Sequence, residues 1–183
     1  MTLRSGRYTL GPDSGTLLVM TGREGPAARM GHDLTLLATR WSATVTVDAD
    51  QPARSRVRAT VEAGSLMVRE ARGGAVGLRE SQREEIESIM RTQVLRSDRH
   101  PTITFRSTSV QRDGMRATVT GNLTIRRRSR AVVLELRVAR TASPQVRATT
   151  SIVQTEFGIK PYSALLGALR VTDVVEVAID VLL

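Results

Sequence analysis

Few residues of this chain could do acid–base or metal chemistry. Its two histidines, His32 in MGHDL and His100 in DRHP, lie close in sequence to Asp33 and Asp98 respectively. The chain has no cysteine, which excludes disulfides, zinc–thiolate sites and thiol nucleophiles. Two isolated histidines without a third ligand make a weak metal candidate. We therefore expect a protein that is not an enzyme, with no catalytic residue, metal or cofactor. An enzyme using His32 with Asp33 stays open as an alternative.

Basic side chains are the other candidates, because an excess of positive charge suits anionic partners. The 27 basic and 18 acidic residues leave a net charge of +9, and Lys160 is the only lysine. The densest cluster is Arg126, Arg127, Arg128 and Arg130. This cluster is either a solvated turn or a contact for a phosphate or an anionic lipid.

Other classes of function lack their sequence signals. One Trp, two Tyr and two Phe are too few to stack successive bases, and we expect no nucleic-acid partner. No P-loop or dinucleotide fingerprint is present. No apolar run is long enough to span a membrane. The first residues lack the pattern of a signal peptide, which leads us to expect a cytoplasmic protein.

Elements able to position these residues are mostly strands. Strict alternation of apolar and polar residues, as in RVRATVE, indicates a half-buried antiparallel strand. Gly121 falls inside one such run and predicts a bend or bulge. The expected strands are 16–20, 34–38, 41–47, 56–62, 102–110, 115–125, 131–139, 146–152 and 174–183.

One segment has helical rather than strand periodicity. Ile86, Ile89, Met90 and Val94 follow the i, i+3, i+4, i+8 spacing of one helix face. The spacing predicts a helical insertion at about 81–96. A second, short helical segment is expected near 162–169, where SALLGAL lacks β-branched residues.

These elements fit a single domain over residues 1–183. Eight or nine strands are typical of a barrel or a sandwich. The inward positions are mainly Val, Leu, Ile and Ala, and a small barrel of this kind is either filled by its own side chains or holds one apolar ligand. The sequence leaves both interiors open.

Several short motifs occur in a distinctive order along the chain. They are YTLGPDSGTLLV, GHDL, HPTITFRSTSV, GNLTI and the closing TEFGIKPYSALLGALRVTDVVEVAIDVLL. Together they resemble landmarks of the YceI-like family, bacterial lipocalin-like proteins of which several bind polyisoprenoids and many are exported. The resemblance implies a mainly β fold, an antiparallel eight-stranded barrel with a helical insertion. Its implied ligand is a polyprenyl or quinone-like lipid, held with its polar head near the mouth.

The resemblance and the strand alternation together suggest which residues contact such a ligand. The expected apolar lining consists of Val45, Val61, Phe105, Val119, Leu123, Leu134, Leu136, Ile152, Phe157, Ile159, Val177 and Ile179. The expected contacts of the head group are His32, Arg126, Arg127, Arg128 and Lys160. The function expected is non-enzymatic binding or carriage of this lipid without a membrane span. A filled barrel that acts as an interaction or stress-response module through its basic turn is the alternative, and a homodimer is one possible assembly.

Overall fold

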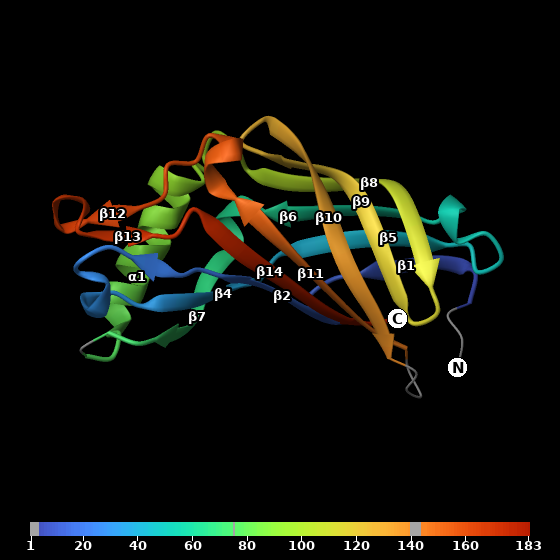
Figure 1. Ribbon diagram of the computed structural model, residues 1–183, viewed down its shortest axis with the longest axis horizontal. Helices are drawn as coiled ribbons and strands as arrows, with labels where there is room; N and C mark the ends of the chain where they lie inside the picture. Colours follow the sequence, from blue (N-terminus) through green and yellow to red (C-terminus); the bar gives the residue numbers. More distant parts are fainter. Residues whose placement is uncertain (1–3, 75, 140–143) are drawn as a thin grey trace.

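The computed structural model describes residues 4–74, 76–139 and 144–183 and consists mainly of one antiparallel sheet. Its eleven strands follow the order β1-β5-β6-β8-β9-β10-β11-β14-β2-β4-β7. The strands are β1 Gly6–Leu10, β2 Gly15–Met20, β4 Asp33–Ala38, β5 Trp41–Val47, β6 Arg56–Glu62, β7 Leu66–Arg72, β8 Thr102–Asp113, β9 Arg116–Ile125, β10 Arg128–Ala139, β11 Gln145–Val153 and β14 Val174–Leu182. The sheet curls into a barrel-like shape around an apolar interior (Figure 1).

The expected number of eight strands is wrong, because three segments of the chain each supply two strands. A turn at residues 11–14 separates β1 from β2, and Thr39 and Arg40 separate β4 from β5. The short 3-10 helix η3 (Ala63–Ser65) separates β6 from β7. These breaks let one segment bend from one part of the curled sheet to another, so that β5 pairs with β1 and β6 while β4 pairs with β2 and β7.

Where alternation is regular, the expected strands are confirmed. β5 and β6 have the predicted bounds, and each of the other expected strands overlaps an observed one. The sequence did not indicate β1 and β7. β1 has five residues and only Tyr8 and Leu10 are not exposed, so its alternation is too short to indicate a strand. The pairing of β7 with β4 shifts register between Thr35 and Leu36, which interrupts the period-two pattern.

The predicted bulge lies opposite Gly121 rather than at it. The pairing of β8 with β9 shifts between Ser107 and Ser109, which leaves Thr108 as the extra residue beside Gly121. A Cβ at Gly121 would lie 2.4 Å from Cζ of Phe105 and 2.5 Å from the carbonyl oxygen of Arg106. Glycine is therefore needed here for the Phe105 ring to lie over the strand.

The predicted helical insertion is confirmed, with α1 (Glu80–Ile89) continuing into a π-helical turn, η4 (Met90–Val94). The short helical or turn segment expected near 162–169 is confirmed only at its centre. Residues 163–171 form a hairpin of β12 (Ser163–Ala164) and β13 (Leu169–Val171), with a 3-10 turn, η6 (Leu165–Gly167), at its tip. β13 also pairs with β3 (Arg23–Glu24) in a small second sheet.

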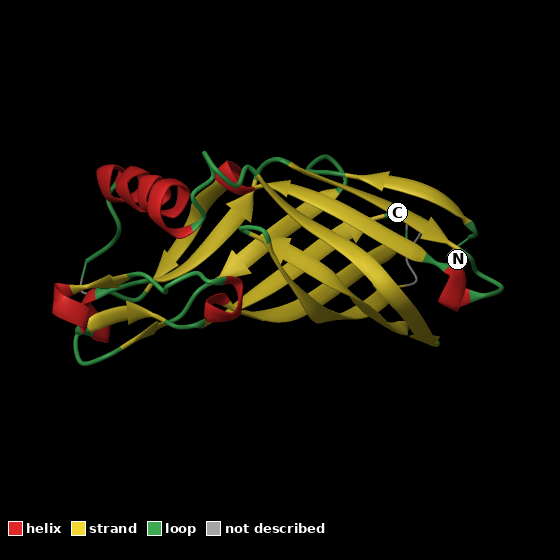
Figure 2. Ribbon diagram, turned by 90° about the horizontal axis from the view of Figure 1, so that it is seen from above, coloured by secondary structure: helices red, strands yellow, loops and turns green. Residues whose placement is uncertain are grey.

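The two ends of the curled sheet differ. Figures 1 and 2 show α1, β12 and β13 gathered at one end, called here the helix end, and the chain termini at the other, called the terminal end. A 3-10 helix, η1 (Ala28–Met30), belongs to the helix end, whereas η2 (Pro52–Arg54) lies at the terminal end. The remaining 3-10 helix, η5 (Gln154–Phe157), follows β11. Among the described residues, no helix is both long and apolar enough to cross a membrane.

Candidate ligand-binding cavity

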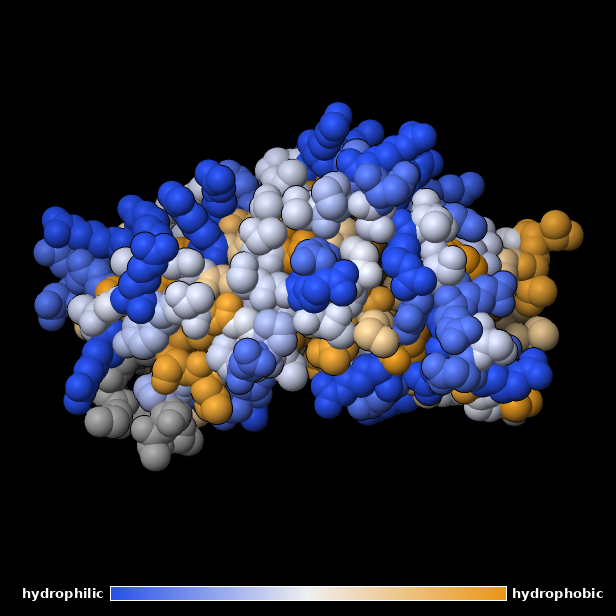
Figure 3. Space-filling model, turned by 180° about the vertical axis from the view of Figure 1, so that it is seen from behind, coloured by the Kyte–Doolittle hydropathy of each residue, from blue (hydrophilic) through white to orange (hydrophobic). Residues whose placement is uncertain are grey.

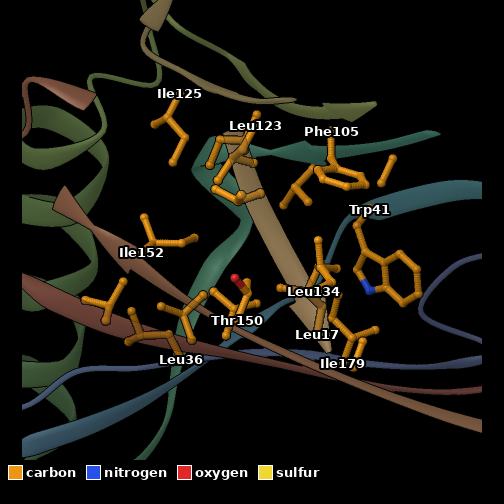
Figure 4. A pocket seen from close by; sticks show the side chains of 18 of the residues that line it. Leu17, Leu36, Trp41, Phe105, Leu123, Ile125, Leu134, Thr150, Ile152 and Ile179 are labelled. Atoms are coloured by element: carbon orange, nitrogen blue, oxygen red, sulfur yellow. The ribbon is translucent and has the colours of Figure 1, made fainter. Parts of the chain in front are cut away.

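The curled sheet encloses a cavity of about 570 Å³. Aliphatic side chains from β2, β4, β5, β6, β8, β9, β10, β11 and β14 line it. Figure 4 shows Leu17, Leu36, Leu134 and Ile152 converging on this interior from different strands, with the hydroxyl of Thr150 among them. Cavities that bind small molecules usually measure roughly 300–1,000 Å³ and have mainly apolar walls. This cavity matches them in size and in lining.

Incomplete burial of the inward-facing side chains shows that the interior is hollow. β6 alternates exposed outward residues with only half-buried inward ones, among them Val57, Ala59 and Val61. β10 repeats the pattern from Val132 to Val138. In a filled barrel such residues would be fully buried, because protein interiors pack as densely as organic crystals. Of the two interiors that the sequence left open, the structure has the hollow one.

All of the predicted lining residues except Phe157 border the cavity. Phe157 is only 1% exposed, but it packs in the core outside the cavity wall. The reason is local, because β11 ends at Val153 and the chain turns into η5, so the strand alternation no longer decides where Phe157 points. Phe157 is thus not among the residues that border the cavity.

The apolar face of the helical insertion forms part of the wall at the helix end. Ile86, Ile89, Met90 and Val94 all border the cavity. Their helical spacing predicted a buried face, and the structure shows that the face covers the cavity. This is a set of lining residues that the strand alternation alone could not find.

Trp41, the only tryptophan of the chain, also borders the cavity. Its side chain lies on the same face of β5 as Ala43 and Val45, and it is 8% exposed. Among the described residues, the indole nitrogen is the one buried side-chain polar atom that has no hydrogen-bond partner. Trp41 is thus a natural fluorescent reporter within the cavity wall.

Polar lining residues concentrate toward the two ends. Arg23, His32, Tyr162 and Arg170 border the cavity at the helix end. Asp48, Ser55 and Arg112 border it at the terminal end. The sequence singled out only His32 among these. The arginines were missed because each stands alone in the sequence and only the fold brings it to the cavity.

His32 borders the cavity, and its side chain is hydrogen-bonded to a neighbouring loop. Its Nε2 donates a hydrogen bond to the carbonyl oxygen of Val76, at 2.9 Å. The ring also lies against Gly74, where a Cβ would stand 2.4 Å from Nε2. Asp33 forms its ion pair with Arg23 instead, at 3.6 Å. The two members of the histidine–aspartate pair therefore have different partners.

The other predicted head-group contacts lie outside the cavity lining. Arg127, Arg128 and Lys160 are exposed and do not border the cavity. The guanidinium group of Arg126 donates hydrogen bonds to the carbonyl oxygens of Val94, at 3.3 Å, and Gly158, at 3.1 Å.

Arg126 is also electrostatically crowded. Partial burial lowers the pKa of Arg126, and the nearby positive charges of Arg96 and Arg128 lower it further. Two consecutive residues of this turn, Arg126 and Arg127, adopt left-handed backbone conformations with φ of 49° and 64°. The hydrogen bonds of Arg126 give the turn a structural role, since they tie it to the end of η4 and to the residue after η5.

No cluster of three or more His, Asp or Glu suited to a metal ion occurs in the parts of the chain that the structure describes. The largely apolar cavity wall offers mainly dispersion contacts and desolvation, with charged groups at its ends. Such a site can hold an apolar molecule by burial.

A barrel-like antiparallel sheet that encloses an apolar cavity defines the class of this protein by its fold. Within that class, the YceI-like domain model matches residues 20–183. The chain belongs to the YceI-like family. None of the curated proteins compared with it matches.

Solved structures share the fold at low sequence identity. BcnA of Burkholderia cenocepacia is 16% identical, with a TM-score of 0.69 over 92% of this chain and 96% of that one. A polyisoprenoid-binding domain from Saccharophagus degradans, implicated in plant cell wall breakdown, is 10% identical, with a TM-score of 0.61 over 98% of each chain. The YceI protein of Campylobacter jejuni is 15% identical, with a TM-score of 0.57 over 81% of this chain and 82% of that one.

Proposed function

We propose that this protein binds an isoprenoid-type lipid inside the sheet and carries it without chemical change. The observation that carries the proposal is the cavity of about 570 Å³, with walls that are almost entirely aliphatic. Membership of the YceI-like family and the fold shared with a polyisoprenoid-binding domain support a lipophilic ligand. The ligand proposed is a polyprenyl or quinone-like lipid.

Burial is the source of affinity in this mechanism. Each methylene transferred from water contributes about 0.8 kcal/mol, so a prenyl tail can bind with few polar contacts. The branched Val, Leu and Ile side chains of the wall are half-buried around the void, and a methyl-branched tail would fill the space that they leave. Part of the gain is offset by the cost of immobilising the ligand, estimated at about 4–15 kcal/mol for association in general. Several isoprene units are therefore needed for tight binding.

A polar head would lie at an end of the cavity, because polar lining is concentrated there. Tyr162 and Arg170 border the cavity at the helix end. Arg170 is paired with Glu24 at 3.3 Å but is 55% exposed, and its guanidinium has further donors for an anionic or carbonyl oxygen. His32 is close by, but its Nε2 is already bonded to Val76. Arg127, Arg128 and Lys160 could reach a head group only if it extended out of the cavity.

Titration of Trp41 fluorescence with prenols of increasing length tests the proposal. A ligand in the cavity would displace water near the indole and change its emission in a saturable way. We expect affinity to rise with each added isoprene unit and then level off when the cavity is full. Because burial drives binding, the affinity should change little with salt. A wild-type protein whose emission no prenol or prenylquinone alters would contradict the proposal.

The substitution Trp41→Phe supplies the control for the signal. This variant should lose the emission change while native mass spectrometry still detects the bound prenol. An emission change that persists in the variant would show that the signal arises outside the cavity.

A further inference from the structure

Two exposed leucines occupy strained backbone positions at the tip of the β12–β13 hairpin. Leu165 has φ of 51°, and Leu166 has φ of 55° with ψ of 32°. This left-handed region is energetically costly for residues other than Gly, Asn and Asp. Leu165 is 51% exposed and Leu166 is fully exposed. Leu166 buries none of its side chain in compensation for this strain, and strained residues of this kind often mark functional sites.

A third apolar side chain lies beside this tip. Met30, at the end of η1, is 64% exposed. The segment around η1 packs against the hairpin, because the Ala27 N–H donates to the Ala168 carbonyl oxygen at 2.9 Å and Leu169 packs on Gly31. We call Met30, Leu165 and Leu166 the apolar tip. Figure 3 shows apolar atoms projecting at the right-hand end of that view, which is the helix end.

The cavity reaches the surface at this same end. Met30 and Tyr162 both border the cavity and are 64% and 40% exposed. Leu169 and Val171 of β13 border it as well. At the terminal end, by contrast, the polar lining residues are buried or half-buried. Of the apolar tip, Met30 therefore borders the cavity, whereas Leu165 and Leu166 lie outside its wall on the same hairpin as Leu169 and Val171.

One positive charge that is unpaired among the described residues, that of Arg29, lies next to the apolar tip. Arg29 precedes Met30, is exposed and forms no ion pair with the described residues. Arg170 is 55% exposed and lies 3.3 Å from the Glu24 carboxylate. Asp33, another acidic residue at this end, is paired with Arg23. The acidic residues of α1 lie apart, because Figures 1 and 2 show the hairpin extending beyond the helix.

We propose that the apolar tip inserts into the surface of an anionic lipid bilayer and so places the cavity mouth against it. The tip is convex and consists of a few residues, whereas a stable protein interface buries about 800 Å² on each partner. Interfacial membrane binding needs only a small apolar surface with basic residues beside it. This docking goes beyond the proposed lipid binding, since it concerns where the protein exchanges its ligand.

Vesicle flotation with the full chain tests the docking. The probes are phosphatidylcholine vesicles with and without phosphatidylglycerol, prepared without any isoprenoid. We expect the wild type to float with the anionic vesicles and to be released by high salt. The double substitution Leu165→Asn, Leu166→Asn should weaken binding at least about tenfold, because it removes most of the apolar tip. Arg29→Gln should mainly reduce the preference for anionic vesicles.

Two controls separate docking from folding and from ligand binding. Asparagine suits the left-handed region, so the double variant should melt at or above the wild-type temperature and should bind a prenol in detergent as the wild type does. Met115→Asn, at an exposed position of the terminal end, should leave flotation unchanged. Wild-type protein that binds neither vesicle, or a double variant that floats like the wild type, would overturn the proposal. A dimer that forms through the same leucines without any vesicle binding would also overturn it.

Discussion

Narrowing the cavity from within should shorten the longest tail that the protein accepts. Ala43 and Ala59 face each other across the β5–β6 pair, and both border the cavity. Both are half-buried because the void lies in front of them. In the double variant Ala43→Leu, Ala59→Leu, the new side chains should enter that void rather than displace neighbouring residues.

The size of the effect follows from the added volume. The two substitutions add about six carbon atoms, which is roughly one isoprene unit. Excluding a unit of about five carbons, at about 0.8 kcal/mol each, removes about 4 kcal/mol of burial free energy. That loss corresponds to about a thousandfold weaker Kd for a tail that just fills the wild-type cavity. A tail one unit shorter should bind both proteins with similar affinity.

Titration of Trp41 emission with a series of prenols measures this shift. Filling a void adds apolar contacts, so the thermal midpoint of the variant should equal or exceed that of the wild type. Val133→Leu is the matched control, because Val133 is 46% exposed on the outer face of β10. The reasoning would be refuted if the folded double variant bound the long prenol as tightly as the wild type does.

Two further predictions concern the frame around the cavity. Gly121→Ala places a methyl group 2.4 Å from Cζ of Phe105. We expect the free energy of unfolding, measured by urea denaturation, to fall by about 1–3 kcal/mol. An unchanged urea midpoint would contradict the close packing of Gly121 against Phe105. Arg126→Ala removes the hydrogen bonds to Val94 and Gly158, and we expect the free energy of unfolding to fall by about 2 kcal/mol in the same assay. The control Arg130→Ala should change the free energy of unfolding by less than about 0.5 kcal/mol.

Alternation along the sequence was sufficient to predict the strands that have one face in the interior. In β6, the residues Val57, Ala59 and Val61 predicted both the strand and its inward face. Alternation missed β1, an edge strand with most of its residues exposed. Phe157 was expected from the resemblance of its motif and not from alternation, and it lies outside the cavity lining because the strand ends before it and a 3-10 turn sets the direction of its side chain.

The sequence alone could not predict the void or its mouth. A row of inward-facing valines and leucines is compatible both with a solid core and with a hollow barrel, and only the curvature of the sheet decides between them. Arg23 and Arg170 are far apart in sequence and meet at the mouth because β3 pairs with β13. The leucines of SALLGAL indicated a helix, whereas the structure places two of them in a strained turn.

Native mass spectrometry of the protein purified from its source tests the central claim most directly. We expect a population heavier than the polypeptide by the mass of one prenyl lipid, which organic extraction releases and identifies. The fraction of this population should fall for the Ala43→Leu, Ala59→Leu variant and stay the same for Val133→Leu. Protein that carries no lipid and takes up none when incubated with prenols or prenylquinones would contradict the account.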